Sequence, residues 1–320
     1  MPKDLSAAWK TRQRRWLRFV QANLRAMNDG KAIRTGPSAR PLEAPAVKAG
    51  KGPPLKVVIC SPHPDDEGII GALPLRLHRE GGAKVANIAI TLGSKPGRRP
   101  RRLRELKASC AVLGFDFTLA NPPWGFDEVN LDNRKNHPKE WAAKVRVLSR
   151  ALEQESPDAV FAPHAEDFNS THIGTHYLVV DAVGDYLERT GRGPLPFFET
   201  EFWQQNSCPN LMVGVTPADE AILIMATAEH GVEVRRNPYH LRHPGRMIDN
   251  VRRGAEVVGG AGGAAPDIPF AELYRLVFMA GRKWVAPRPG GRVIEAAEKI
   301  EWRELIQSFW PEALEGVMRS

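Results

Sequence analysis

The stretch "PHPDDE" at residues 62–67 places one histidine and three acids directly after an apolar run. Carboxylates this close together repel one another and lose hydration free energy when they are buried. A bound cation offsets both costs, and histidine with carboxylate is a donor set that zinc accepts. The stretch therefore predicts a metal site in which His63 and Asp66 converge on the ion and Asp65 points elsewhere. A turn followed by the acidic first turn of a helix is the alternative explanation.

A second polar cluster, "PHAEDFNSTH" at residues 163–172, follows another apolar run. His172 can supply a third metal ligand from this cluster, and two histidines with one carboxylate form a common catalytic zinc site. Zinc lowers the pKa of a bound water and polarises a carbonyl group. A free carboxylate such as that of Asp65 can then accept the proton of the water. Asp167 is a candidate to orient a ligand histidine from behind.

The two clusters follow strands in a pattern that alternates strands with helices. Such alternation predicts an α/β fold, a mostly parallel sheet with helices on both faces. In such sheets, ligands bind outside the carboxyl ends of the strands, so both clusters are expected at one edge. Apolar runs predict strands at 55–60, 83–94, 115–120 and 158–163, and helical periodicity predicts helices at 67–81, 101–114, 140–156 and 171–189.

These motifs resemble the PIG-L/LmbE family of zinc-dependent N-deacetylases. The resemblance covers about residues 55–190 and extends to "TLGS" at 91–94 and to the pattern Arg102-x-x-Glu105. It implies a Rossmann-like sheet and removal of an acetyl or short acyl group from an N-acylated amino sugar or related amide. It also implies that His63, Asp66 and His172 bind Zn²⁺. Asp65 would be the general base, and Arg102 would contact the substrate.

The second motif departs from the family pattern His-Pro-Asp-His. Asn169 stands where the family has the first histidine, and Thr171 replaces an acid. Asparagine can donate a hydrogen bond to an oxyanion, but it cannot transfer a proton at neutral pH. Asn169, His164 at the strand end and His176 one helical turn after His172 are therefore the candidate catalytic groups that stabilise the oxyanion.

Three regions are expected along the chain. Residues 1–54 form a basic N-terminal helix and linker, residues 55–190 form the metal-binding core, and residues 191–320 complete the domain and supply substrate loops. The apolar periodicity of residues 5–28 predicts a helix that packs on the main domain or on a dimer partner, with a membrane-surface helix as the alternative.

The later segments carry weaker predictions. Strands are expected at 196–203 and 210–216, and helices at 217–234 and 245–259. Residues 235–253, with His240 and His243, are interpreted as a substrate loop. The basic segment at 95–104 is predicted to be a solvated loop, with binding of a substrate phosphate or carboxylate as the alternative. The aromatic cluster Phe197, Phe198, Phe202 and Trp203 is assigned to the core, with the lining of a pocket as the alternative.

Composition narrows the class of protein. The three cysteines among 320 residues include no CxxC pair, which argues against a disulfide framework and favours a cytoplasmic location. No apolar stretch is long enough for a transmembrane segment. The net charge of +8 permits anionic partners, but no nucleic-acid motif is present. The sequence thus predicts a metal-dependent hydrolase acting on linear amide bonds, and leaves open whether the chain forms a homo-oligomer. The alternatives are a metal-retaining but non-catalytic protein that binds an anionic glycan or nucleic acid, and an esterase acting on O-acyl groups.

Overall fold

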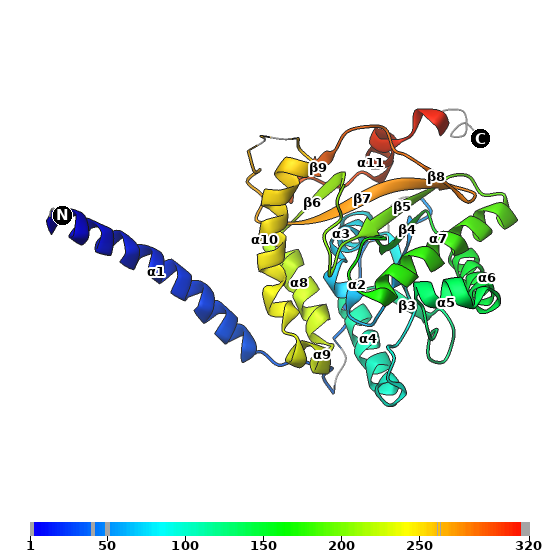
Figure 1. The fold of residues 1–320 in the computed structure, drawn as a ribbon, viewed down its shortest axis with the longest axis horizontal. Coiled ribbons are helices and arrows are strands. Elements are labelled where there is room, and N and C mark those ends of the chain that lie inside the picture. The colour runs from blue at the N-terminus through cyan, green and yellow to red at the C-terminus, as the bar shows by residue number, and fades with distance from the viewer. Residues whose placement is uncertain (1–2, 40–41, 49–51, 261, 263, 315–320) are drawn as a thin grey trace.

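A single mixed sheet organises the protein, whose computed structural model describes residues 3–39, 42–48, 52–260, 262 and 264–314 (Figure 1). The strand order is β3-β2-β1-β4-β5-β7-β6-β9, and β8 pairs with β7. Strands β1 to β5 are parallel neighbours, whereas β7 runs antiparallel to both β5 and β6. The strands are β1 (Lys56–Ser61), β2 (Lys84–Ala89), β3 (Asp116–Leu119), β4 (Ala159–Pro163), β5 (Leu195–Thr200), β6 (Leu211–Val215), β7 (Phe270–Ala280), β8 (Lys283–Val285) and β9 (Arg292–Ile294).

Helices cover both faces of this sheet (Figure 1). One apolar core contains side chains of α3, α4 and α8, and the other contains side chains of α6 and α7. The predicted α/β class is therefore confirmed. The α-helices are α1 (Lys3–Lys31), α2 (Asp66–Ile69), α3 (Ala72–Gly81), α4 (Arg99–Leu113), α5 (Leu131–Asn136), α6 (Pro138–Glu155), α7 (Ser170–Thr190), α8 (Pro217–Ala228), α9 (Gly231–Arg236), α10 (Tyr239–Val257) and α11 (Trp302–Phe309), and the short 3₁₀ helices are η1 (Pro96–Arg98) and η2 (Glu312–Leu314).

Strand β1 shows why its sequence is a continuous apolar run. Val57 and Ile59 point into one core, while Val58 and Cys60 point into the other. Successive side chains of a strand face opposite sides of the sheet, so a strand covered on both faces needs apolar residues at every position. The position of β1 in the middle of the parallel strands brings its carboxyl end beside that of β4.

Two predicted helices are each broken in the structure. The helix predicted at 67–81 divides into α2 and α3, because the Tyr274 hydroxyl donates to the Ile70 carbonyl (2.8 Å) and accepts from the Leu73 N–H (3.0 Å) at the break. The helix predicted at 217–234 divides into α8 and α9, and His230 at this break turns into the interior. The first break also has a local cause, because Pro74 has no N–H to donate to the Ile70 carbonyl. The second break depends on the burial of His230, which helical periodicity does not reveal.

The interpretation of residues 235–253 as a substrate loop is wrong over most of its length, because α10 already begins at Tyr239 and continues through Pro244. Burial and tertiary hydrogen bonds outweigh the proline. His243 bonds the Glu220 carboxylate through Nδ1 (2.9 Å) and the Ile69 carbonyl through Nε2 (3.0 Å), so it supports the helix and not a second metal.

The segment at 95–104 is not the solvated loop that its charge predicts. It forms η1 and the first turns of α4. Strands β7 to β9 and helix α11 had no sequence prediction, and β7 is the strand that joins β5 to β6. Its neighbours lie far away in the chain, so no local pattern marks its place in the sheet.

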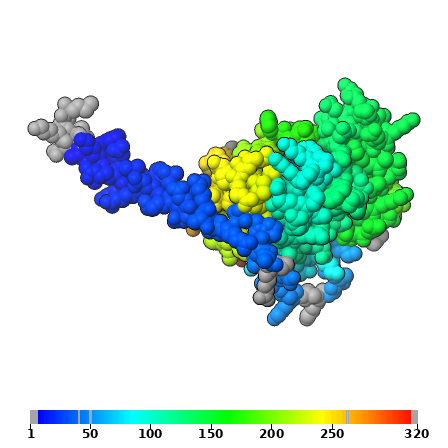
Figure 2. Space-filling model, turned by 90° about the horizontal axis from the view of Figure 1, so that it is seen from below, coloured from blue at the N-terminus to red at the C-terminus, as the bar shows by residue number. Residues whose placement is uncertain are grey.

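Helix α1 does not pack along the main domain. Figures 1 and 2 show it projecting from the body, with only its C-terminal end close to α10. The chain then attaches to the body, where the Gly36 N–H donates to the Ala228 carbonyl (2.8 Å). Over the described part of the chain, no helix is both long and apolar enough to cross a membrane.

Candidate metal and active site

The two motifs meet because their strands are neighbours. Strand β1 pairs with β4 in parallel, with Val57 opposite Ala159 and Ile59 opposite Phe161. His63 and Asp66 lie in the turn and helix that follow β1, and His172 lies in the first turn of α7, after β4. Parallel strands end at the same edge of the sheet, so residues about a hundred positions apart come into contact there.

Three side chains at this edge form a compact triangle. His63 Nδ1 lies 3.3 Å from His172 Nε2, His172 Nε2 lies 3.6 Å from Asp66 Oδ1, and His63 Nδ1 lies 3.8 Å from Asp66 Oδ2. Ligand atoms about 2.0–2.1 Å from a tetrahedral zinc ion are themselves roughly 3.3 Å apart. Asp66 Oδ1 is buried and has no hydrogen-bond partner, which a cation would supply. The residues present therefore fit a divalent metal ion.

The charges of the triangle also fit a cation. Burial and, to a smaller extent, the neighbouring Asp65 raise the pKa of Asp66 to about 7, although His172 opposes both effects. Burial, together with His172 and Arg102, holds the pKa of His63 well below its usual range, so its ring is neutral and available as a ligand. Burial also opposes protonation of His172, but Asp66 and Asp167 outweigh it and raise its pKa. A buried carboxylate whose charged form is disfavoured gains most from a nearby metal ion.

Asp167 stands behind the triangle. Its Oδ2 lies 3.6 Å from Nδ1 of His172, while its Oδ1 accepts the Asn169 N–H (2.8 Å). His172 therefore directs Nε2 toward the other two ligand atoms and Nδ1 toward a carboxylate. This arrangement fixes the ring orientation that a metal ligand requires.

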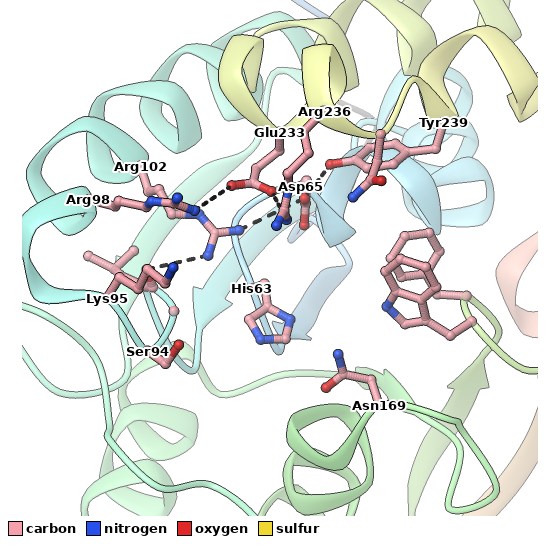
Figure 3. Close-up of a pocket in the computed structure, with 15 residues that line it drawn as sticks. His63, Asp65, Ser94, Lys95, Arg98, Arg102, Asn169, Glu233, Arg236 and Tyr239 are labelled. Carbon is pink, nitrogen blue, oxygen red and sulfur yellow. Dashed lines mark hydrogen bonds and ion pairs between the residues drawn. The ribbon is translucent and has the colours of Figure 1, made fainter.

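Asp65 adopts an unusual backbone conformation beside the triangle. Its φ of 124° lies in a region that residues other than glycine rarely occupy. The Asp65 N–H donates to Glu67 Oε2 (3.0 Å), the Tyr239 hydroxyl donates to its carboxylate, and Arg102 Nη2 lies 3.9 Å from Oδ2. Burial raises the pKa of Asp65, although Arg102, His230 and Tyr239 oppose this shift. These contacts hold a backbone conformation that turns the Asp65 carboxylate toward the cavity (Figure 3).

Glu67 and His230 form a fully buried pair behind Asp65. His230 Nε2 lies 2.7 Å from Glu67 Oε1. Burial alone would raise the pKa of Glu67 and lower that of His230, but their mutual attraction outweighs burial and reverses both shifts. Each partner therefore favours the charged form of the other, and the pair fixes the carboxylate that accepts the Asp65 N–H.

Arg102 links the first motif to the loop after β2. Its guanidinium donates to the Pro64 carbonyl (3.2 Å) and to the Leu92 carbonyl (3.5 Å). Gly93 has φ +84°, and a Cβ atom there would lie 2.3 Å from Arg102 Nη1. A larger residue at Gly93 would thus displace the arginine beside Asp65, which explains the glycine of the "TLGS" segment.

A cavity of about 230 Å³ opens above the triangle (Figure 3). His63 and Asp65 lie at its base, and four cationic side chains, Lys95, Arg98, Arg102 and Arg236, lie around it. Glu233 lies 3.9 Å from Arg98 and also pairs with Arg236. We call this cavity the central pocket. It is lined by His63, Asp65, Leu92, Gly93, Ser94, Lys95, Arg98, Arg102, Asn169, Phe202, Trp203, Glu233, Arg236, Asn237 and Tyr239.

Asn169 lines the central pocket, unlike the two candidate histidines. Its side-chain oxygen caps α7 by accepting the N–H groups of Thr171 (2.9 Å) and His172 (3.4 Å). Because the oxygen is engaged at the helix, the amide NH₂ is the end of the group that faces the cavity (Figure 3).

His164 and His176 do not line the pocket. His164 Nδ1 accepts the Glu166 N–H (3.2 Å) and Nε2 bonds the Gln204 carbonyl (2.9 Å), so both of its ring nitrogens are engaged. His176 Nδ1 bonds the Pro163 carbonyl (2.8 Å), and its ring stacks on Trp284. The structure thus brings only Asn169 of the three candidates to the site.

Several pocket residues were missed or placed differently by sequence reasoning. Tyr239, Glu233 and Arg236 come from α9 and α10, which have no recognisable motif. His230, which holds Glu67, was also missed. Phe197 and Phe198 are core residues as predicted, but Phe202 and Trp203 line the pocket. Their signal, an aromatic pair directly after a strand, is shared by many ordinary core segments.

Comparison with known proteins places these features in context. The model of the PIG-L family, described as GlcNAc-PI de-N-acetylase, matches residues 58–183. A comparison with curated proteins found no match.

Solved structures share the fold at low sequence identity. A conserved protein from Thermus thermophilus is 18% identical, with 69% of this chain and 94% of that chain covered at a TM-score of 0.51. The A40926 pseudoaglycone deacetylase Dbv21 is 15% identical, with 70% and 98% covered at a TM-score of 0.50. These likenesses establish the fold, and the family match covers both metal-site motifs. Residues 58–183 of this chain are therefore similar to the PIG-L family model, in line with the resemblance of the sequence motifs.

Proposed function

We propose that this protein is a metal-dependent N-deacylase that removes an acetyl or other short acyl group from an N-acylated amino sugar or related amide. The observation that carries the proposal is the triangle of His63, Asp66 and His172 beside the Asp65 carboxylate, at the base of an open pocket. The family match, whose description names a de-N-acetylase, supports the same reaction.

In this proposal His63 Nδ1, the Asp66 carboxylate and His172 Nε2 hold the metal, with Zn²⁺ as the ion that suits this donor set. A zinc ion bound there would lower the pKa of a coordinated water and polarise the acyl carbonyl. Asp65 accepts one proton from the water that attacks the carbonyl carbon. It then gives this proton to the departing nitrogen as the carbon–nitrogen bond breaks, which leaves a carboxylic acid and an amine. The acid releases its proton to the amine or to solvent and becomes a carboxylate.

Asn169 supplies a further donor in this mechanism. Its amide NH₂ faces the pocket, and such a group can stabilise the negative charge that develops on the acyl oxygen. Asn169 has no proton to transfer at neutral pH, so Asp65 must handle both proton transfers. Arg102 and Tyr239 hold the Asp65 carboxylate in position for them.

The pocket also favours a substrate that carries an anionic group. Arg102 is engaged with backbone carbonyls, and Glu233 offsets one of the two charges of Arg98 and Arg236. Lys95 adds another positive charge at the exposed rim. The wall formed by Lys95, Arg98 and Arg236 is therefore positive, and arginine is suited to phosphate or carboxylate.

The test combines metal content with product release. The protein is purified without chelator, its zinc per chain is measured, and amine and acetate release are assayed with N-acetylglucosamine, with its 1-phosphate and with an O-acetyl sugar. The proposal expects about one zinc per chain and amine release that is faster with the phosphate. Release from the O-acetyl sugar alone would replace the proposal with an esterase. Zinc binding without release from a wide panel of N-acyl and O-acyl compounds would favour a binding protein.

A further inference from the structure

Helix α1 exposes an apolar face that nothing else in the described part of the chain covers. Trp9, Trp16 and Phe19 are 63%, 61% and 61% exposed, and Leu24 is 58% exposed. Trp9, Trp16, Val20 and Leu24 are separated by seven, four and four residues, so they follow one side of the helix. Isolated apolar residues are normal on a protein surface, but a continuous stripe with two tryptophans marks an interaction surface.

The opposite side of α1 is cationic. Lys10, Arg14, Arg18 and Arg25 are separated by four, four and seven residues and so share a second side of the helix. Arg12 and Arg15 add two more positive charges, and residues 5–28 contain no Asp or Glu. Residues 5–28 therefore combine an apolar stripe with six cations and no acid.

The charge pattern discriminates among the candidate partners. A second copy of α1 would bring eight more cations against two acids, Asp4 and Asp29, so pairing of the two stripes would gather like charges. Nucleic acid would neutralise the cations but would leave the tryptophan stripe in water. An anionic lipid surface matches both sides, because the stripe enters the acyl boundary while the cations remain among the headgroups.

We propose that α1 is a membrane-surface helix that binds bilayers containing anionic lipids and holds the enzyme body at that surface. Its 29 residues correspond to about 43 Å of helix lying in the interface. The chain after α1 attaches beside α9, where Gly36 contacts Gly231. Helix α9 also carries Glu233 and Arg236 of the central pocket, so lipid binding would place one wall of this pocket near the membrane. The proposal is independent of the deacylase reaction.

The test measures co-sedimentation of the full chain with vesicles. Phosphatidylcholine vesicles are compared with vesicles of phosphatidylcholine and phosphatidylglycerol, at low and at high salt. We expect binding to the mixed vesicles, a decline with salt, and a blue shift of tryptophan fluorescence. Replacing Arg14, Arg18 and Arg25 by Gln is expected to weaken binding roughly 100-fold, since each cation near an anionic surface contributes about 1 kcal/mol.

A matched pair of variants separates insertion from charge. Trp16→Glu and Thr11→Glu each add one negative charge, the first on the apolar stripe and the second on the cationic side. We expect Trp16→Glu to weaken binding at least about tenfold more than Thr11→Glu, since only the first removes an aromatic ring that would enter the bilayer. Circular dichroism checks that both variants stay helical.

Three results would overturn the proposal. The first is equal binding to neutral and mixed vesicles, and the second is an equal loss of binding in the two variants. The third is that the chain binds no vesicles but forms a dimer that Trp16→Glu dissociates. Binding of α1 to RNA with no vesicle binding would also exclude a lipid surface. Amine release from soluble substrates should be the same for wild type and Trp16→Glu, so a failure of this proposal would leave the proposed reaction untouched.

Discussion

The two walls of the central pocket differ in how their chemistry is encoded. The wall formed by residues 62–67, 91–102 and 169–172 comes from short motifs that follow strands of the parallel sheet. The opposite wall comes from α9 and α10, whose Glu233, Arg236 and Tyr239 belong to no motif. In the proposed mechanism the first wall supplies the metal ligands and the base. The second wall would position the base and set the charge around the substrate, so the two walls should differ in the size and kind of effect that mutations produce.

The largest effect is expected from the motif wall at His172. His172→Ala removes the ligand that faces both His63 and Asp66, so the metal should be lost. Because the metal contributes several kcal/mol of transition-state stabilisation, amine release should fall on the order of 10⁴-fold. Zinc analysis and turnover on the same preparation provide the measurement. Full activity without bound metal would show that the triangle is not the reaction centre.

The next effect is expected at Asp65, which is proposed to move protons and not to bind metal. Asp65→Asn should retain zinc while kcat falls about 10³-fold, within the range typical of a lost general base. The readout is zinc content beside kcat. Retained turnover would refute the role of Asp65, and simultaneous loss of zinc would place it among the ligands.

An effect on the stability of the fold at acidic pH is expected at His176, which lies on α7 but outside the central pocket. Burial lowers the pKa of His176 to about 4, while Glu199 lies 3.6 Å from its ring. The unfolded state takes up a proton near pH 6.5, before the folded state does, so stability falls as the pH decreases from 6.5 to 4. The difference corresponds to roughly 3 kcal/mol at pH 4.

His176→Phe should remove this part of the pH dependence. At neutral pH the variant should lose about 1 kcal/mol, because the Pro163 carbonyl loses its donor. Urea denaturation of both proteins at several pH values measures the difference, and zinc content and turnover at pH 7 should stay close to those of the wild type. An unchanged acid slope, or a loss of metal, would contradict the structural role assigned to His176.

A smaller effect is expected in the second wall at Tyr239. Tyr239→Phe removes the hydroxyl that donates to Asp65, and hydrogen bonds to charged groups contribute about 1.5–3 kcal/mol. We therefore expect kcat to fall roughly 10- to 100-fold with zinc content unchanged. Tyr177→Phe, on α7 and outside the pocket lining, serves as the control. If both variants behave like the wild type, the second wall has no part in positioning the base.

The smallest effect is expected at Arg98, which should act on substrate affinity alone. Arg98→Gln should raise KM about fivefold for a phosphorylated N-acetyl sugar, in line with about 1 kcal/mol for a partly exposed charge contact. It should leave KM for the neutral sugar unchanged. Arg104→Gln, an exposed residue of α4 outside the pocket, is the matched control. Equal changes in KM for the phosphorylated and the neutral sugar would show that the cationic wall does not discriminate between substrates by their charge.

The sequence by itself determined the parts of the protein whose cause is local. A strand that is buried on both faces requires apolar residues at successive positions, so the run "LKVVIC" predicted a central strand. The motif after that strand and the motif after β4 predicted that His63, Asp66 and His172 lie together, because parallel strands bring their carboxyl ends together. These residues could be chosen from their types and their places after strands.

Only the tertiary structure decided the features that depend on distant partners. It broke the predicted helix at His230, where the contact with Glu67 replaces helical continuity. It brought Tyr239 to Asp65 across 174 positions, and it carried α1 away from the body. The physical reason is that such contacts depend on the free energy of long-range packing and charge pairing. The local periodicity of a sequence does not contain this information.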